Sequence, residues 1–329
     1  MALYDLPLDK LRRHVTATQQ PRDLDAFWAD QLDRARSRAA PPSIEPVDTG
    51  LSRVRTDDVW FSGADGDRIA AWWHRPVGVE GPLPVIVRYQ GYGGGRGLAH
   101  QVPVWVSAGY ACLEVDTRGQ GSGWAPGDTP DPVGSGPAHP GYLTRGLGSP
   151  EQHYYTRVFT DAVLAVDAAV EMPEADPQRI VVTGVSQGGG ITIAVAALHG
   201  GVLGAMPDVP FLCDIRRATQ ICDAEPYAEL RRYLSVHRTG ADKAFATLAY
   251  LDGAVLASRA AVPALFSVAL MDLTCPPSTV YAAYQAWGGP KEMVEYPWNG
   301  HEGGQAFQER AQLRWLEDLL AVRGTPEQG

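Results

Sequence analysis

The sequence predicts an α/β fold, a mostly parallel central sheet with helices on both faces. Two patterns predict it. From Leu83 onward, short apolar runs alternate with stretches of helical periodicity. Glycines bound the runs, and the runs are continuously apolar, which is typical of strands buried on both faces. With 45% apolar and 20% charged residues, the 329-residue chain can bury a core of that size. No repeat, low-complexity tail or long linker interrupts it, so we expect a single domain, 1–329.

The N-terminal part predicts a helix and a hairpin, at about 21–75. Residues 21–37 have helical apolar spacing with acidic residues in the first turn. Residues 54–61 and 69–74 are expected to pair as antiparallel strands, joined by a turn that carries Asp65, Gly66 and Asp67.

The rest of the chain predicts six strands and five helices in alternation. The strands are expected at 83–89, 110–115, 180–183, 204–206, 264–270 and 292–296, and the helices near 98–108, 156–172, 187–199, 277–287 and 305–322. Residues 210–258 break the alternation, because they are polar and helical without a strand, and we expect an inserted helical cap there. Residues 121–150 are rich in glycine and proline and predict a long functional loop.

Charge and apolar patterning exclude several classes of partner. The net charge is −10, from 28 basic and 38 acidic residues, which argues against binding nucleic acid or an anionic membrane. Residues 1–20 hold no apolar run of the signal-peptide kind, and the longest apolar stretch, 254–271, is interrupted by Arg259 and Pro263. The four cysteines have neither zinc-site nor C-x-x-C spacing, so we expect them to be reduced and buried. Together these features predict a cytoplasmic protein without metal or organic cofactor.

The strongest local motif is Gly184-Val185-Ser186-Gln187-Gly188, a G-x-S-x-G sequence. It follows a predicted strand and opens a predicted helix, which is the setting of a nucleophile elbow. The alternative is a tight strand-to-helix turn with an incidental serine. The pattern favours Ser186 as a nucleophile.

A nucleophilic serine needs a histidine as base, placed later in the chain if the order is serine, acid, histidine. His199 ends the helix after the elbow and His237 lies in the predicted cap. His301 follows the last predicted strand, at the carboxyl edge of the sheet where ligands bind in open α/β folds. We therefore predict that His301 is the base.

The acid should follow another strand and reach the far ring nitrogen of the histidine. Asp272 directly ends the apolar run before it, 29 residues ahead of His301. Asp252 in the cap and Glu302 beside the base are its rivals, but adjacent side chains rarely face each other, so Glu302 is interpreted as a loop anchor. We predict Asp272.

Two further patterns concern the surroundings of the serine. The sequence from His301 to Gln305 is H-E-x-x-Q, which lacks the second histidine of a zinc protease. An oxyanion hole needs two donors, and we expect one from the backbone of Gln187 and one from the glycine-rich loop 90–97. That loop carries no phosphate-binding motif.

Together, these segments resemble the acetyl xylan esterase/cephalosporin-C deacetylase family of α/β-hydrolases, carbohydrate esterase family 7. The resemblance extends over nearly the whole chain. It rests on the RGQ motif Arg118–Gln120, the GxSQG motif 184–188 and the HE pair His301-Glu302. Further matches are Gln90-Gly91-Tyr92, residues 157–162, residues 208–213 and residues 275–279.

The resemblance implies roles for individual residues. Ser186, His301 and Asp272 would be nucleophile, base and acid, and the backbone N–H groups of Tyr92 and Gln187 would hold the oxyanion. Arg118 and Gln120 would hold loops around the site. The family also implies a helical insertion, matching 210–258, and a homohexamer whose active sites open inward.

The expected substrates are small acetylated molecules, such as xylo-oligosaccharides, other acetylated sugars and cephalosporin C. Tyr92, Trp124, Pro210 and Phe211 are expected to close the acyl pocket, and Phe211, Leu212 and the cap helices to contact other copies. Small departures from the family pattern, at 121–124 and at Gln305, affect the expected pocket shape only. Two alternatives remain: a general short-chain carboxylesterase or peptidase of the same fold, and a non-catalytic binding protein.

Overall fold

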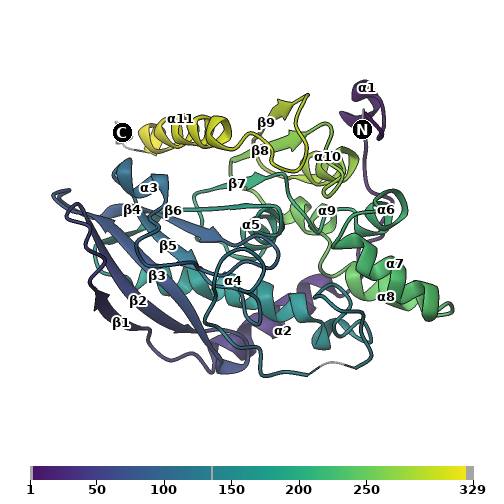
Figure 1. Ribbon diagram of the computed structural model, residues 1–329, viewed down its shortest axis with the longest axis horizontal. Helices are drawn as coiled ribbons and strands as arrows, with labels where there is room; N and C mark the ends of the chain where they lie inside the picture. Colours follow the sequence, from purple (N-terminus) through teal and green to yellow (C-terminus); the bar gives the residue numbers. More distant parts are fainter. Residues whose placement is uncertain (1–2, 135, 324–329) are drawn as a thin grey trace.

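The fold is a three-layer α/β arrangement around one mixed sheet (Figure 1). The computed structural model describes residues 3–134 and 136–323. Within these residues, nine strands form the sheet in the order β1-β2-β3-β5-β4-β6-β7-β8-β9. The strands are β1 Ser43–Val47, β2 Val54–Ser62, β3 Arg68–Pro76, β4 Leu83–Tyr89, β5 Ala111–Val115, β6 Ala175–Val185, β7 Gly204–Asp208, β8 Ala264–Ala269 and β9 Lys291–Tyr296. All neighbours from β5 to β9 pair in parallel, which confirms the predicted sheet.

Helices cover both faces of this sheet. They are α1 Leu8–Leu11, α2 Leu24–Arg36, α3 Val104–Ser107, α4 Tyr154–Val170, α5 Gln187–Leu198, α6 Ile215–Ile221, α7 Tyr227–Val236, α8 Ala241–Leu248, α9 Gly253–Leu256, α10 Pro277–Ala286 and α11 Ala306–Arg323. The larger core packs α2, α4, α5, α9 and α10 against one face. A smaller core on the other face joins the sheet to α3 and α11 through Ile86, Trp105 and Leu316.

The predicted hairpin is present and forms part of the main sheet. β2 pairs antiparallel with β3, with Phe61 opposite Ile69, and β3 then pairs antiparallel with β5. The edge strand β1 was not predicted, because its five residues include Pro46 and lie largely in solvent. A short, half-polar edge strand has no periodicity that distinguishes it from a loop.

The helix predicted at 98–108 is wrong over its first half. Only Val104–Ser107 are helical. Pro103 disfavours helical backbone at Val102, so the helix begins after the proline.

The segment predicted as a cap contains α6 to α9, and these helices lie beside the carboxyl ends of the strands (Figure 1). Phe211 and Leu212, expected on its surface, are 0% and 1% exposed and belong to the larger core. The expectation that these two residues contact other copies is therefore wrong. The reason is that they follow β7 closely and pack against the cap, where the Phe211 ring contacts Tyr227 of α7 and the carbonyl oxygen of Leu212 accepts the N–H of Gly253. Among the described residues, no helix combines the length and apolar character needed to cross a membrane.

Candidate active site

Ser186 lies in a sharp turn between β6 and α5. Its backbone has φ 58° and ψ −114°, a strained conformation for a residue with a side chain. The flanking glycines make the turn possible. A Cβ on Gly184 would lie 2.4 Å from the backbone of Gly188, and a Cβ on Gly188 would lie 2.3 Å from the carbonyl oxygen of Tyr89. The G-x-S-x-G sequence is therefore needed for the chain to present the serine hydroxyl above the sheet.

The structure brings Ser186, His301 and Asp272 into one hydrogen-bonded chain. Ser186 Oγ lies 3.0 Å from Nε2 of His301. On the other side of the ring, Nδ1 lies 2.9 Å from Oδ2 of Asp272. The three residues follow β6, β9 and β8, whose carboxyl ends meet at one edge of the sheet. In this arrangement the imidazole can accept the serine proton while the carboxylate orients the ring.

Asp272 is held rigidly in its loop. It is 0% exposed, and its Oδ1 accepts the backbone N–H groups of Thr274 at 2.7 Å and Cys275 at 2.9 Å. The other carboxylate oxygen is left for His301. Because backbone amides fix one oxygen, the position of the carboxylate depends on the position of the loop itself.

The rival residues have other partners. His199 pairs with Asp167 at 3.0 Å, and the ring of His237 stacks on Tyr233. Asp252 accepts three backbone N–H groups around the starts of α6 and α9. Glu302 accepts from the side chain of Asn299 and from the backbone of Gly300. Hydrogen bonds from its own backbone N–H, from Asn299 and from Gly300 lower the pKa of its carboxyl. These partners place Glu302 in the loop of His301, as a group that braces that loop.

Gln120 connects the loop that carries Tyr92 to the serine turn. Its Oε1 accepts the backbone N–H of Gly93 at 2.7 Å, and its Nε2 donates to Oε1 of Gln187 at 2.9 Å. The amide of Gln187 in turn donates to the carbonyl oxygen of Gln90 at 3.1 Å. The two glutamine side chains therefore fix both backbone segments that are predicted to supply oxyanion donors.

Arg118 binds carboxylates that lie outside the site. Its guanidinium is 0% exposed and binds both carboxylate oxygens of Asp161, at 2.6 and 2.7 Å, and Asp67 at 2.9 Å. Burial raises the pKa of Asp161, and the arginine supplies the opposite charge that this carboxylate needs. Arg118 thereby joins α4 to the turn between β2 and β3 beneath the site.

The side chain of Tyr92 is anchored to the cap. Its hydroxyl donates to Glu229 of α7 and accepts the backbone N–H of Tyr142 at 2.8 Å. Glu229 is buried and also accepts from Leu143 at 3.0 Å. The sequence did not single out Glu229, because no local motif marks a carboxylate whose partners, Tyr92, Tyr142 and Leu143, lie 86 or more residues away.

The other predicted pocket residues occupy different surroundings. Trp124 is 62% exposed, and its indole N–H donates to the carbonyl oxygen of Tyr92 at 2.9 Å. Phe211 is fully buried and packs edge-on against the Tyr92 ring at 6.2 Å, and Pro210 is buried beside Gly189 of α5. Phe211 and Pro210 thus lie in the packed interior, beside Tyr92 and α5, and their place in the acyl pocket stays a prediction.

A thiol lies beside the predicted nucleophile. Sγ of the buried Cys275 is 3.9 Å from Ser186 Oγ. Asp272, Cys275 and His301 bring groups that can ligate metals within 4.8 Å of one another. Both ring nitrogens of His301 are already hydrogen bonded, so the geometry fits proton transfer better than metal ligation.

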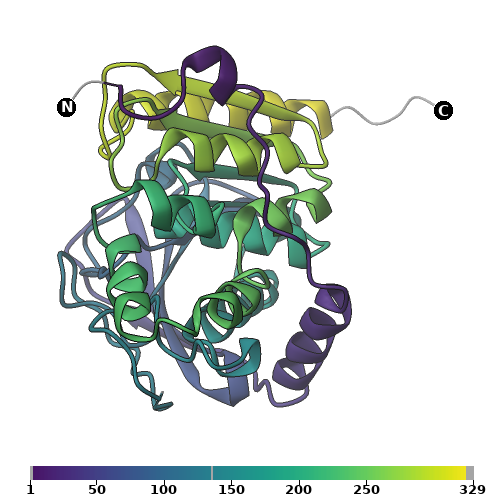
Figure 2. The same ribbon diagram turned by 90° about the vertical axis from the view of Figure 1, so that its right-hand side faces the viewer.

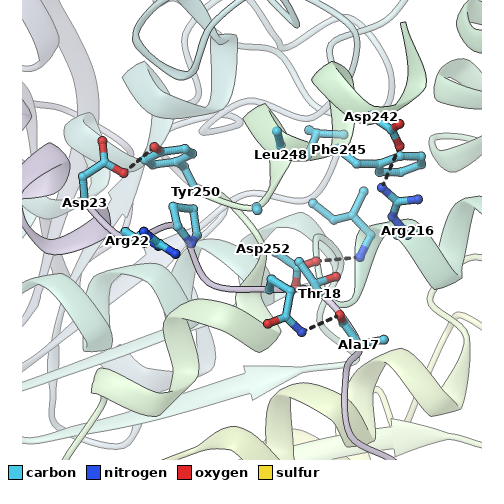
Figure 3. A pocket seen from close by; sticks show the side chains of 15 residues that line it. Ala17, Thr18, Arg22, Asp23, Arg216, Asp242, Phe245, Leu248, Tyr250 and Asp252 are labelled. Atoms are coloured by element: carbon cyan, nitrogen blue, oxygen red, sulfur yellow. Dashed lines mark hydrogen bonds and ion pairs between the residues drawn. The ribbon is translucent and has the colours of Figure 1, made fainter. Parts of the chain in front are cut away.

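A separate cavity of about 620 Å³ lies between residues 17–23 and helices α6 and α8 (Figure 3). Four of the residues that line it interact in pairs: Arg216 forms an ion pair with Asp242, and the hydroxyl of Tyr250 donates to Asp23. None of the site residues predicted from the sequence lines this cavity.

Comparison with known proteins identifies close relatives. The family described as acetyl xylan esterase (AXE1) matches residues 1–319. An acetyl xylan esterase from Paenibacillus sp. R4 is 36% identical, with a TM-score of 0.90 over 95% of this chain and 99% of that one. Acetyl xylan esterase 1 from Thermoanaerobacterium sp. JW/SL YS485 is 32% identical, with a TM-score of 0.88 over 96% and 99%. These two likenesses confirm the predicted α/β-hydrolase fold.

A curated relative, acetyl esterase Axe7A from Xylanibacter ruminicola, is 26% identical over 291 residues. The match includes 86% of this chain, and the chain spans 64% of the length of that protein.

Proposed function

The chain belongs to the acetyl xylan esterase family, and we propose that it is a serine esterase that removes acetyl groups from small acetylated sugars. The observation that carries this proposal is the chain of hydrogen bonds from Ser186 Oγ to His301 at 3.0 Å and from His301 to Asp272 at 2.9 Å. Neither hydrogen bond follows from fold likeness alone, because a hydrolase-fold binding protein has no need to retain them.

In the proposed mechanism Ser186 Oγ attacks the acetyl carbonyl carbon while Nε2 of His301 takes the serine proton. The buried carboxylate of Asp272 orients the ring and stabilises the imidazolium that forms. The backbone N–H groups of Tyr92 and Gln187 hold the tetrahedral oxyanion. His301 then protonates the departing sugar oxygen.

The second half of the reaction releases the acetyl group. A water molecule gives its proton to His301 and attacks the acetyl-enzyme, and acetate leaves as the proton returns to Ser186. This chemistry needs no further co-reactant besides water.

Acetylated xylo-oligosaccharides are the proposed substrate class, because the relatives at 36% and 32% identity are acetyl xylan esterases. Cephalosporin C, an acetylated small alcohol, is a second proposed substrate. We also propose a homohexamer, which the family resemblance supports. A cytoplasmic location is proposed because all four cysteines are free and buried, as thiols in a reducing compartment are.

Acetate release tests the proposal. The protein is assayed with p-nitrophenyl acetate, acetylated xylo-oligosaccharides and cephalosporin C, with and without a serine-reactive phosphonate. The proposal expects acetate from the sugars and loss of all activity after phosphonate treatment. Hydrolysis of p-nitrophenyl acetate without any turnover of the sugars would favour a general short-chain carboxylesterase, and no hydrolysis at all would favour a binding protein.

A further inference from the structure

The N-terminal segment, residues 3–7, crosses the loop that carries Asp272. Figure 2 shows the chain entering beside α10 before it runs along the molecule toward α2. The hydroxyl of Tyr4 donates to the backbone carbonyl oxygen of Asp272 over 2.6 Å. The two residues are 268 positions apart in the sequence, so this contact exists only in the folded chain.

The next residue, Asp5, binds the other end of the same loop. Its side chain is 3% exposed, and Oδ2 accepts the backbone N–H of Ser278 at 2.8 Å. Ser278 lies in the first turn of α10, whose N-cap residue, Pro276, makes no side-chain capping hydrogen bond. Asp5 therefore satisfies a backbone donor that a capping side chain would otherwise take.

Arg217 of α6 closes this cluster. Its Nη2 donates to Oδ1 of Asp5 at 2.9 Å, and its Nε donates to Oγ of Ser278 at 2.6 Å. The buried carboxylate thus has a cation beside it, and the guanidinium joins the N-terminal segment, the cap and α10. A paired and hydrogen-bonded carboxylate of this kind holds a fixed geometry.

These contacts hold the loop from Asp272 to Ser278 at both ends. Between those ends, backbone amides of the loop bind the Asp272 carboxylate itself. A shift of the loop backbone would therefore move the carboxylate away from His301 Nδ1, which now lies 2.9 Å from it. Errors of this kind in a catalytic group reduce rates strongly even when no reacting atom is removed.

We propose that Tyr4 and Asp5, together with Arg217, are positioning residues. They keep the carboxylate of Asp272 within hydrogen-bond distance of His301. The proposal rests on the esterase function proposed above. It assigns to the N-terminal segment a part in catalysis that its distance in sequence from Ser186, Asp272 and His301 does not suggest.

Steady-state kinetics of p-nitrophenyl acetate hydrolysis by the full chain test this proposal. Tyr4→Phe removes one hydroxyl and Asp5→Asn removes the charge that faces Arg217. Each is expected to lower kcat by about tenfold with KM within about twofold of the parent, because the loss affects the transition state and leaves substrate binding intact. Arg12→Ala is the matched control, since the exposed Arg12, which follows α1, pairs with the half-buried Glu295 of β9 and not with residues 272–278. It is expected to leave kcat unchanged.

A second measurement separates positioning from loss of folded protein. Asp272 is the hydrogen-bond partner of the His301 ring, and two further carboxylates, Asp208 and Glu302, are near enough to interact with it electrostatically. A displaced Asp272 stabilises the protonated ring less, so the acidic limb of kcat/KM against pH should move to lower pH in Tyr4→Phe and Asp5→Asn. Partial unfolding would lower the curve without moving it.

The outcomes are distinct. A kcat equal to that of the parent in both variants, or a lowered curve with its acidic limb unmoved, would overturn the proposal. If instead the parent itself gives no hydrolysis, the esterase function has failed.

Discussion

Gln120 Nε2 donates to Gln187 Oε1 over 2.9 Å, so the RGQ motif and the nucleophile turn are directly hydrogen bonded through their glutamines. The same Gln120 side chain accepts the N–H of Gly93, next to Tyr92. One amide group therefore sets the distance between the two backbone segments that are proposed to bind the oxyanion.

We predict that Gln120→Leu lowers kcat by about tenfold to a hundredfold while KM changes by no more than about twofold. Leucine has a similar volume but can neither accept from Gly93 nor donate to Gln187, so the oxyanion donors lose their spacing. Gln178→Leu, on an exposed part of β6, is the control and should have parental rates. A Gln120→Leu variant with parental kcat would show that the oxyanion loop keeps its position without this amide.

Acetyl esters should be hydrolysed faster than longer acyl esters. The Tyr92 ring cannot easily move aside, because its hydroxyl is bound to Glu229 and its face is packed by Phe211. An added methylene against a fixed wall costs about 1–3 kcal/mol, or roughly 5–150-fold in rate. A roomy apolar pocket would instead gain about 0.8 kcal/mol per methylene. Values of kcat/KM for the acetate, propionate, butyrate and octanoate esters of p-nitrophenol distinguish the two, and a rise from acetate to butyrate would contradict the deacetylase assignment.

Stability should fall as pH rises through the range in which Asp208 titrates. Burial raises the pKa of this carboxyl, which accepts from Ser267, from 3.8 to about 6. The folded protein therefore binds the proton more tightly than the unfolded chain does. The resulting stabilisation is complete below about pH 4 and is lost as pH rises through 6. It amounts to about 3 kcal/mol at most, from about two pKa units.

Urea unfolding of the parent and of Asp208→Asn, at pH 4 to 7 and one protein concentration, measures this contribution. Asparagine is neutral at every pH and keeps an oxygen for Ser267. The unfolding free energy of the parent should therefore fall relative to that of the variant as pH rises. A difference that stays constant across this range would show that folding does not raise the pKa of Asp208.

The assembly is predicted to be a homohexamer. Light scattering at micromolar concentration should give six times the 35.4 kDa mass of one chain. Since Phe211 and Leu212 are buried, substitutions there should destabilise the folded chain itself and not a contact between copies. A mass of 35.4 kDa would refute the hexamer.

The sequence was informative where one local pattern determines a structure. Glycines 184 and 188 are required by close backbone contacts around Ser186, so the turn could be predicted from five consecutive residues. His301 and Asp272 could be placed because each follows an apolar run, and the ends of parallel strands meet. Apolar runs and the helical spacing between them likewise predicted most of the strands in the sheet and most of the helices that cover it.

What could not be predicted depends on contacts between distant segments. Glu229 meets Tyr92 across 137 positions, and Tyr4 meets Asp272 across 268. Phe211 was misplaced because an apolar residue in a polar segment fits a surface contact or a core equally well. Only the packing of that segment beneath the cap decides between the two.

Ser186 is proposed as the nucleophile of an esterase, and a comparison of the parent with Ser186→Ala tests this role. Acetate release from p-nitrophenyl acetate is measured for the parent and Ser186→Ala, and a phosphonate probe is followed by mass spectrometry on both. We predict that the variant keeps its fold and assembly, loses at least about a thousandfold in kcat and takes up no probe, since the oxyanion hole alone has no group to attack with. The parent should carry one phosphonate, on Ser186. A variant within roughly tenfold of the parent, or one that is still labelled at the same site, would contradict the assignment.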